Sequence, residues 1–367
     1  MTLKRGGREM PGKNSLGNTG IEVIEPLEEE KIIDIVNQVS TRIMTAFPDN
    51  KLSYLDIYRT LLDTPMYYAR IPKGLSKANY YYKDSSIYFS DKANLSEVDE
   101  FIFHEFIHRL QERKDKKGKI TRLGVCEVNE LSVKATALNE AAIQFVTVKA
   151  FDMPKKQVNI YNITLPSRTE YYPIITNIIS QLAFLLGENI LIDSTIKGNE
   201  DFKIDIIDNI GENEYNFIEK NLNEILRIKK EIADIQNSMQ IKDKWEGTDN
   251  LKYLEIEKKS KYIKKIYFDI QNKIYTSYFD NLLKRTENDL EVNMILKKIQ
   301  DYEEYIGVSE DNIAFSLFFS DFTKRAEKRI EELKNKTALV VFKDNFISRV
   351  IRKIKRLFKN SENEYQK

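Results

Sequence analysis

Cysteine and histidine are almost absent from this chain of 367 residues, which contains one cysteine and two histidines. The single cysteine, Cys126, excludes an internal disulfide and any metal site built from several thiolates. We expect it to be a lone buried thiol, and the alternatives are a fourth metal ligand or a nucleophile. A metal site in this chain would have to use histidine and carboxylate side chains.

An excess of charge and long apolar runs are also missing. The chain has 58 lysines and arginines against 57 aspartates and glutamates, so no net field attracts it to nucleic acid and we expect no such partner. No apolar run of signal-peptide length follows the basic start, residues 1–8, and no stretch approaches the roughly 20 apolar residues of a membrane span. The sequence therefore predicts a cytoplasmic protein.

Both histidines lie in one short stretch, Phe103-His104-Glu105-Phe106-Ile107-His108. Residues four apart share a face of an α-helix, so the two imidazoles can hold one metal ion while Glu105 lies beside the open coordination position. This is the H-E-x-x-H arrangement of zinc peptidases, and Zn²⁺ is the expected metal. The alternative is an amphipathic helix whose polar face happens to carry two histidines.

The residues before the motif predict a small sheet. Strand composition occurs at Met66–Ile71, and the stretches Asn79–Tyr82 and Ser86–Ser90 flank a turn, as in a hairpin. The edge of such a sheet can hold an extended peptide across the metal. The alternative for this tyrosine-rich hairpin is a stable two-sided sheet without a role in binding.

Two helices should carry the metal ligands. Ser96 and Asp99 predict the cap of the motif helix, which we expect from about Glu97 to Lys114. A second helix is predicted at Ala135–Val146, where small residues allow close approach of another helix. The sequence thus predicts that the second helix packs against the motif helix.

Catalytic zinc is usually held by three protein ligands, and no third histidine exists. Glu140, on the small-residue helix, is the best placed third ligand. The rivals for this role are Glu127, Glu130 and Glu170. A capping or surface role is the alternative for Glu140.

These residues resemble the gluzincin group of metallopeptidases, in which H-E-x-x-H is followed by a glutamate ligand on a later helix, often within Asn-Glu. The matching residues are His104, Glu105, His108, Asn139 and Glu140. The resemblance covers roughly residues 50–235 and implies an α+β, zincin-like catalytic domain. It further implies hydrolysis of a peptide or protein substrate, with Glu105 as general base for a metal-activated water.

The sequence departs from the group's pattern at two places. In thermolysin-like members an aspartate four residues past the glutamate ligand orients a ligating imidazole, and Gln144 stands at that position here. The chain also lacks the downstream histidine that stabilises the transition state in such members. Tyr172 and Tyr171, with Arg168 behind them, are the candidate donors for that role, and ordinary packing is the alternative for both tyrosines.

The sequence divides into three parts. Residues 1–24 predict a disordered leader, 25–240 the zincin-like domain with N-terminal support helices, and 251–367 a mainly helical region. Within the last part, 338–360 combine an apolar helical face with many basic residues. Such a segment can bind a membrane surface, a partner or the protein's own domain.

Two alternatives to a peptidase stay open. They are an inactive zincin-fold scaffold acting through the helical region and a hydrolase of non-peptide amides.

Overall fold

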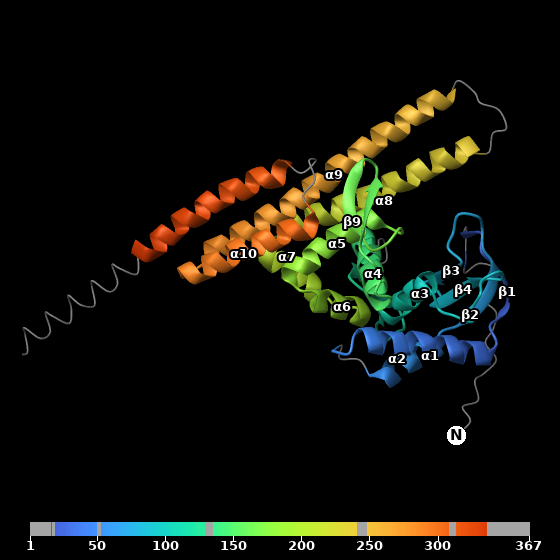
Figure 1. Ribbon diagram of the computed structural model, residues 1–367. Helices are drawn as coiled ribbons and strands as arrows, with labels where there is room; N and C mark the ends of the chain where they lie inside the picture. The colour runs from blue at the N-terminus through green and yellow to red at the C-terminus, as the bar shows by residue number, and fades with distance from the viewer. Residues whose placement is uncertain are drawn as a thin grey trace, which may run out of the picture. The chain divides into compact units, whose positions relative to one another are not determined.

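The computed structural model describes residue 16 and residues 19–49, 53–128, 135–240, 248–307 and 313–335. It is a mixed α+β structure with small sheets and a helical C-terminal region, as predicted (Figure 1). The chain divides into two compact units, Met1–Ile274 and Tyr275–Lys367. Only the first unit carries the histidine motif.

A four-stranded sheet precedes the motif helix in the first unit. Its strand order is β1 (Glu22–Pro26), β2 (Met66–Arg70), β4 (Ser86–Ser90) and β3 (Ala78–Tyr81), with β2 and β4 parallel and the other pairs antiparallel. The predicted strand and hairpin are therefore confirmed. Strand β3 lies at an edge of the sheet, on the side that contacts the motif helix.

Strand β1 corrects the end of the predicted disordered leader, residues 1–24, because the strand begins at Glu22; residues 1–15, 17 and 18 lie outside the described residues. Most of its side chains are exposed, so the sequence shows no alternating apolar pattern there. Backbone pairing with β2 forms the strand, while Leu16 and Ile21 are buried against Tyr67 and Tyr88. The contacts that order this segment lie about 50 residues or more further along the chain, where local sequence patterns cannot show them.

The two predicted support helices, α1 (Glu29–Ala46) and α2 (Tyr54–Leu62), are present (Figure 1). Helix α1 buries one apolar stripe, which includes Ile35, Val36 and Val39. It contacts α2 and α4 (Thr136–Ala150), and α2 contacts α3 (Glu100–Leu110). The support helices thus pack against the two helices that carry the expected ligands.

The motif helix α3 is shorter than the predicted Glu97–Lys114. Asp99 caps it alone, because its side chain accepts the Ile102 N–H at 3.1 Å, whereas Ser96 bonds to Asn94 in the preceding turn. The helix ends at Leu110, and the next residues form strand β5 (Glu112–Lys114). Glu112 is buried in this extended segment and accepts hydrogen bonds from Tyr80 and Ser85 of the hairpin.

Strand β5 pairs with β6 (Ile120–Leu123), which continues through a tight turn into β7 (Cys126–Glu127). Gly124 in this turn has a φ of +57°, and a Cβ there would overlap the side chains of Gln111 and Asn139. Asn139 also accepts the Val125 N–H at 3.2 Å. The turn therefore packs closely against α4 at Asn139, which is the residue before Glu140.

We expect Gly124→Ala to lower the free energy of unfolding by about 2 to 4 kcal/mol, because it adds overlap to the strain of a left-handed backbone. Gly118→Ala is the matched control, since Gly118 also has a positive φ of +80° but has open space around it. The control should lose only about 1 kcal/mol. Urea unfolding of both variants measures the difference, and equal losses would show that the close approach at Gly124 contributes nothing.

After α4 the chain forms a hairpin, β8 (Lys156–Ile160) with β9 (Ile163–Ser167), which the sequence did not predict. Helix α5 (Pro173–Leu186) follows, and Gly187 is its C-cap. The first unit continues with α6 (Glu188–Lys197), α7 (Asp201–Ile210), α8 (Glu212–Gln240) and the part of α9 (Thr248–Arg285) up to Ile274. In the described part of the chain, no single helix is long and apolar enough to span a bilayer. Helices α5 and α6 together have that length and composition, but the pair is bent by 118°.

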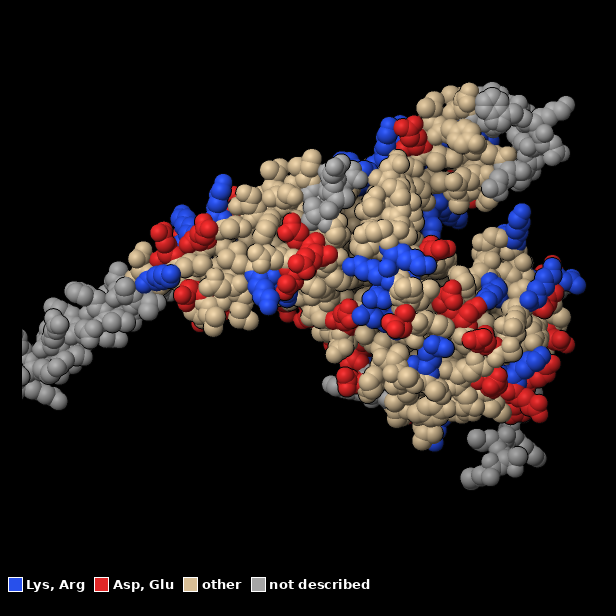
Figure 2. Space-filling model, in the orientation of Figure 1, with Lys and Arg blue, Asp and Glu red and all other residues tan. Residues whose placement is uncertain are grey.

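The second unit is helical, in line with the prediction for 251–367. It contains the end of α9 (Thr248–Arg285), α10 (Asp289–Ile306) and a helix at 313–335. Aromatic side chains fill its core: Tyr275, Phe279, Tyr302, Phe315 and Phe322 are all buried. The unit begins inside α9 rather than at residue 251, and the basic segment 338–360 lies outside the described residues. On the face drawn in Figure 2, basic and acidic side chains are interspersed.

Candidate metal centre

His104, His108 and Glu140 come together between α3 and α4. Glu140 places one carboxylate oxygen 3.3 Å from His104 Nε2 and the other 3.5 Å from His108 Nε2. One ligand atom from each of the three residues lies within 4.8 Å of the other two. Two imidazole nitrogens and a carboxylate oxygen facing one point form a cluster that can bind a metal ion, and among the described residues it is the one group of this kind.

Burial and the mutual charges of the three residues together set their protonation. It lowers the pKa of His108 to about 4, which leaves this imidazole neutral and able to act as a ligand. Burial also acts on His104, but the hydrogen bond and charge of Glu140 outweigh it and raise the pKa of His104. Burial would raise the pKa of Glu140, yet both histidines and Lys229 keep that pKa below its usual value. The carboxylate is therefore ionised.

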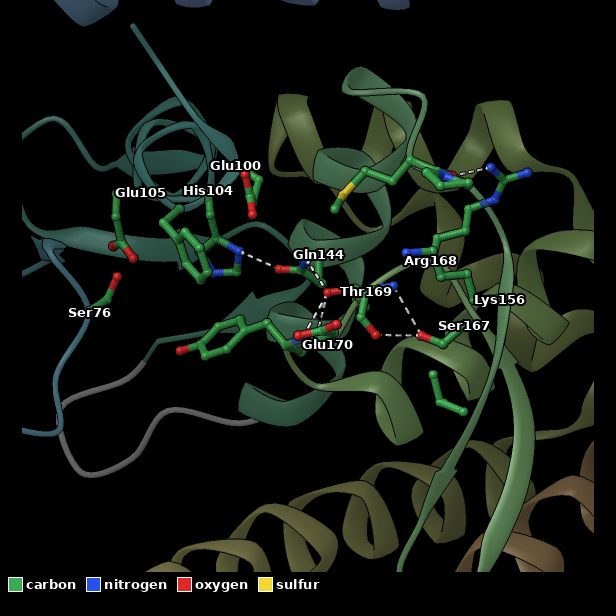
Figure 3. Close-up of a pocket in the computed structure, with 15 residues that line it drawn as sticks. Ser76, Glu100, His104, Glu105, Gln144, Lys156, Ser167, Arg168, Thr169 and Glu170 are labelled. Carbon is green, nitrogen blue, oxygen red and sulfur yellow. Dashed lines mark hydrogen bonds between the residues drawn. The ribbon is translucent and has the colours of Figure 1, made fainter. Parts of the chain in front are cut away.

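Gln144 fixes the orientation of His104 (Figure 3). His104 Nδ1 lies 3.1 Å from Gln144 Oε1, and Gln144 Nε2 donates to Thr169 Oγ1 at 2.9 Å. Because the amide nitrogen is engaged by Thr169, the amide oxygen faces the imidazole and accepts its N–H, which turns Nε2 toward Glu140. Gln144 thus contacts a candidate ligand, as its place four residues past Glu140 suggested. Thr169, on the loop after β9, has no feature in the sequence that pointed to the site.

We expect Gln144→Leu to weaken metal binding by about 10- to 100-fold, because His104 loses the acceptor that fixes its tautomer and ring orientation. Gln144→Glu is the matched control, since its carboxylate keeps an acceptor for His104 and for the Thr169 hydroxyl. Competition with a chromophoric zinc chelator measures both affinities. Tight binding by the leucine variant would show that Gln144 does not orient the ligand.

Glu105 lies on the side of α3 that faces the sheet edge. Its Oε2 accepts the backbone N–H of Tyr80 on β3 at 2.6 Å. Burial raises the pKa of Glu105 to about 7, against the opposing charge of His104 and the Tyr80 N–H. The ring of Tyr80 stacks on His108 with centroids 5.8 Å apart and an angle of 7° between the rings.

Tyr80 therefore contacts both the expected base and an expected ligand, and its hydroxyl is anchored on buried Glu112. The sequence marked the hairpin as a possible substrate edge but did not single out this residue. The strand pattern of the sequence places Tyr80 on the hairpin, but it does not show that Tyr80 faces the motif helix.

Tyr171 and Tyr172 lie next to the cluster at the start of α5. The ring of Tyr171 meets His104 edge-on at 6.0 Å, the two tyrosine rings are 4.1 Å apart, and their hydroxyls are 3.3 Å apart. Burial raises the pKa of both phenols, so both keep their protons and can donate. The Arg168 guanidinium instead donates to the Met153 carbonyl.

The two rival third ligands in the described part of the chain are not grouped with the histidines. Glu127 forms an ion pair with Lys203, the side chain of Glu170 is exposed, and Glu130 lies outside the described residues. Cys126 is a free, buried thiol whose pKa burial raises, as expected for a lone cysteine. Of the four candidate glutamates, Glu140 alone is grouped with the two histidines in the described part of the chain.

A pocket of about 320 Å³ opens beside the cluster (Figure 3). His104, Glu105 and Tyr171 line it on one side, and the hairpin β8–β9 contributes Lys156 and Ser167. The unpredicted hairpin thus forms a wall of the pocket, and a molecule bound there would contact Glu105 directly.

No family model, no curated protein and no solved structure matches this chain. The residues of the site are therefore the basis for assigning a function.

Proposed function

We propose that this protein is a zinc-dependent peptidase whose catalytic domain, residues 25–240, has a zincin-like fold. One observation carries the proposal: Glu140 faces the Nε2 atoms of both histidines of H-E-x-x-H, while Glu105 of the same motif lines the adjoining pocket. The order of sheet, motif helix and glutamate helix supports it, as does the edge position of β3 beside the motif helix.

The donor set supports zinc as the metal. Two imidazoles and one glutamate are a ligand set that catalytic zinc uses, with a fourth position left for water or substrate. A zinc ion held there supplies Lewis-acid polarisation of a carbonyl and lowers the pKa of water to about 7. Gln144 keeps His104 Nε2 directed at the metal position through the bond at Nδ1.

Glu105 is the general base in this proposal. The Tyr80 N–H holds one of its oxygens, which leaves the other free to take a proton from the attacking water and to deliver it to the leaving amine. The buried setting that raises its pKa to about 7 suits a group that accepts and returns a proton near neutral pH.

The substrate would bind as an extended peptide along β3, whose outer edge carries no strand in the described sheet. Its side chains on one side of the scissile bond would enter the pocket between α3 and β8–β9. The phenols of Tyr171 and Tyr172, whose rings lie next to the cluster, are the proposed donors to the oxyanion that develops on the scissile carbonyl.

Metal content and turnover of the purified full-length protein test this proposal. We expect one zinc per chain by inductively coupled plasma mass spectrometry and cleavage of a peptide library that stops on chelation and returns with zinc. Protein that binds zinc but cleaves no peptide would favour the scaffold alternative, and cleavage of small amides alone would favour a non-peptide hydrolase. Absence of bound metal after incubation with excess zinc would overturn all three.

A further inference from the structure

Lys229 on α8 is a half-buried cation beside the metal centre. Its Nζ lies 4.2 Å from the centre of the Tyr172 ring and 5.4 Å from that of Tyr171. In the described part of the molecule it forms no hydrogen bond and no ion pair within 4 Å. Burial lowers the pKa of Lys229 and the charge of Glu140 raises it, so the ammonium is within electrostatic reach of the cluster.

An apolar pocket of about 180 Å³ lies next to this ammonium. Its aliphatic lining consists of Ile160, Ile174, Ile175, Ile225 and Leu226. Lys229, Glu170 and Tyr172 are also among the lining residues, and Glu170 lines the pocket at His104 and Glu105 as well. The two pockets therefore share a lining residue on this loop, and the exposed Glu170 carboxylate makes no ion pair with Lys229.

The charges around the centre leave Lys229 uncompensated. When a divalent ion occupies the cluster, Glu140 and Glu105 face that ion, and Lys229 has no anion within 4 Å among the described residues, although the Glu170 carboxylate lines the same pocket. The aromatic faces of Tyr171 and Tyr172 stabilise a cation only partly. A half-buried ammonium without a close anion gains most from an arriving carboxylate, because charge-assisted hydrogen bonds are about twice as strong as neutral ones.

We propose that Lys229 and the adjoining aliphatic pocket bind an apolar residue of the substrate together with a neighbouring carboxylate. The carboxylate is either the C-terminus of the peptide or an acidic side chain next to the apolar residue. The inference rests on the proposed peptidase function for its substrate and adds the class of peptide that the site selects.

Peptide binding, measured without turnover, tests this subsite. Fluorescence anisotropy would be recorded with three labelled peptides of one sequence ending in leucine: the free acid, the C-terminal amide, and the amide with glutamate before the leucine. The full-length Glu105→Gln protein prevents cleavage, and each titration would be run with and without added zinc. We expect the free acid to bind roughly 10- to 100-fold more tightly than the plain amide.

The third peptide separates the two sources of the carboxylate. If the glutamate-containing amide binds as tightly as the free acid, the subsite takes an acidic side chain. If it binds as weakly as the plain amide, the subsite takes the C-terminus. Both results support a carboxylate subsite.

Lys229→Met should remove the preference for a carboxylate, and Lys229→Arg should keep most of it. Lys230→Met is the matched control, because Lys230 is exposed on the next position of α8 and should leave the preference unchanged. Circular dichroism of each variant confirms that the protein is folded. Equal binding of all three peptides by the parent, or equal loss in the Lys229→Met and Lys230→Met variants, would overturn the subsite.

The subsite and the peptidase proposal fail separately. A protein that shows the Lys229-dependent preference but cleaves no peptide would support the subsite and contradict the peptidase. A zinc-dependent peptidase with no preference for a carboxylate would do the reverse.

Discussion

Glu105→Gln is expected to lower kcat for peptide cleavage by about two to four orders of magnitude while leaving zinc bound. Glutamine fills the same space and can still accept the Tyr80 N–H through its amide oxygen, so the link between α3 and β3 persists. It cannot take the proton of the attacking water. The loss should therefore appear in kcat, with KM and metal stoichiometry little changed.

Glu100→Gln is the matched control, because Glu100 lies on the same helix and lines the same pocket without touching the cluster. Steady-state kinetics and metal analysis of both variants provide the comparison. If the two variants lose activity equally, or if the Glu105 variant keeps full activity, Glu105 is not the general base.

The sequence predicts most directly those residues of the site that lie on one helix, the motif helix α3. His104, Glu105 and His108 occur in one helical turn, so their shared location follows from helix geometry alone. Glu140 lies on another helix, and its choice over Glu127, Glu130 and Glu170 depended on the small residues around it and on the resemblance. The grouping of Glu140 with both imidazoles agrees with that choice.

The residues that sequence reasoning missed all reach the site through tertiary contacts. Tyr80 acts through its backbone N–H, which every residue except proline carries, so no residue type marks it. Thr169 and Lys229 come from a loop and from a helix far along the chain, and serine, threonine and lysine are common on surfaces. Only the packing of α8 and the loop against α4 shows that these side chains face the cluster.

The errors in element boundaries have a similar origin. No glycine or proline interrupts the chain between Leu110 and Gly118, so the sequence gives no signal for the end of the helix at Leu110, and the buried hydrogen bonds of Glu112 to the hairpin are made from an extended chain. Strand β1 has mostly exposed side chains, so its order comes from backbone pairing that no apolar pattern records. Strand β8 also has mostly exposed side chains, whereas β9 is mostly buried but contains Pro166, which is unfavourable for a strand in a sequence reading.

Glu140→Ala is expected to remove stoichiometric zinc and to weaken metal binding by more than about 100-fold. This loss exceeds the one expected for Gln144→Leu, because Glu140 is a ligand and Gln144 only orients one. Two imidazoles from one helical turn cannot complete a closed coordination shell alone, and the described residues offer no other carboxylate in the cluster. Metal that binds the folded protein also raises Tm by mass action, so the wild type should gain thermal stability from zinc and the variant should not.

Glu170→Ala serves as the control, because Glu170 is a rival ligand on a nearby loop and should leave both metal content and the zinc-dependent rise in Tm unchanged. Isothermal titration with zinc and thermal unfolding with and without the metal measure the two effects. If the Glu170 variant loses zinc and the Glu140 variant retains it, the metal is held at a different point. The general base and the carboxylate subsite would then have to be assigned again around that point, since both are placed here by their relation to Glu140.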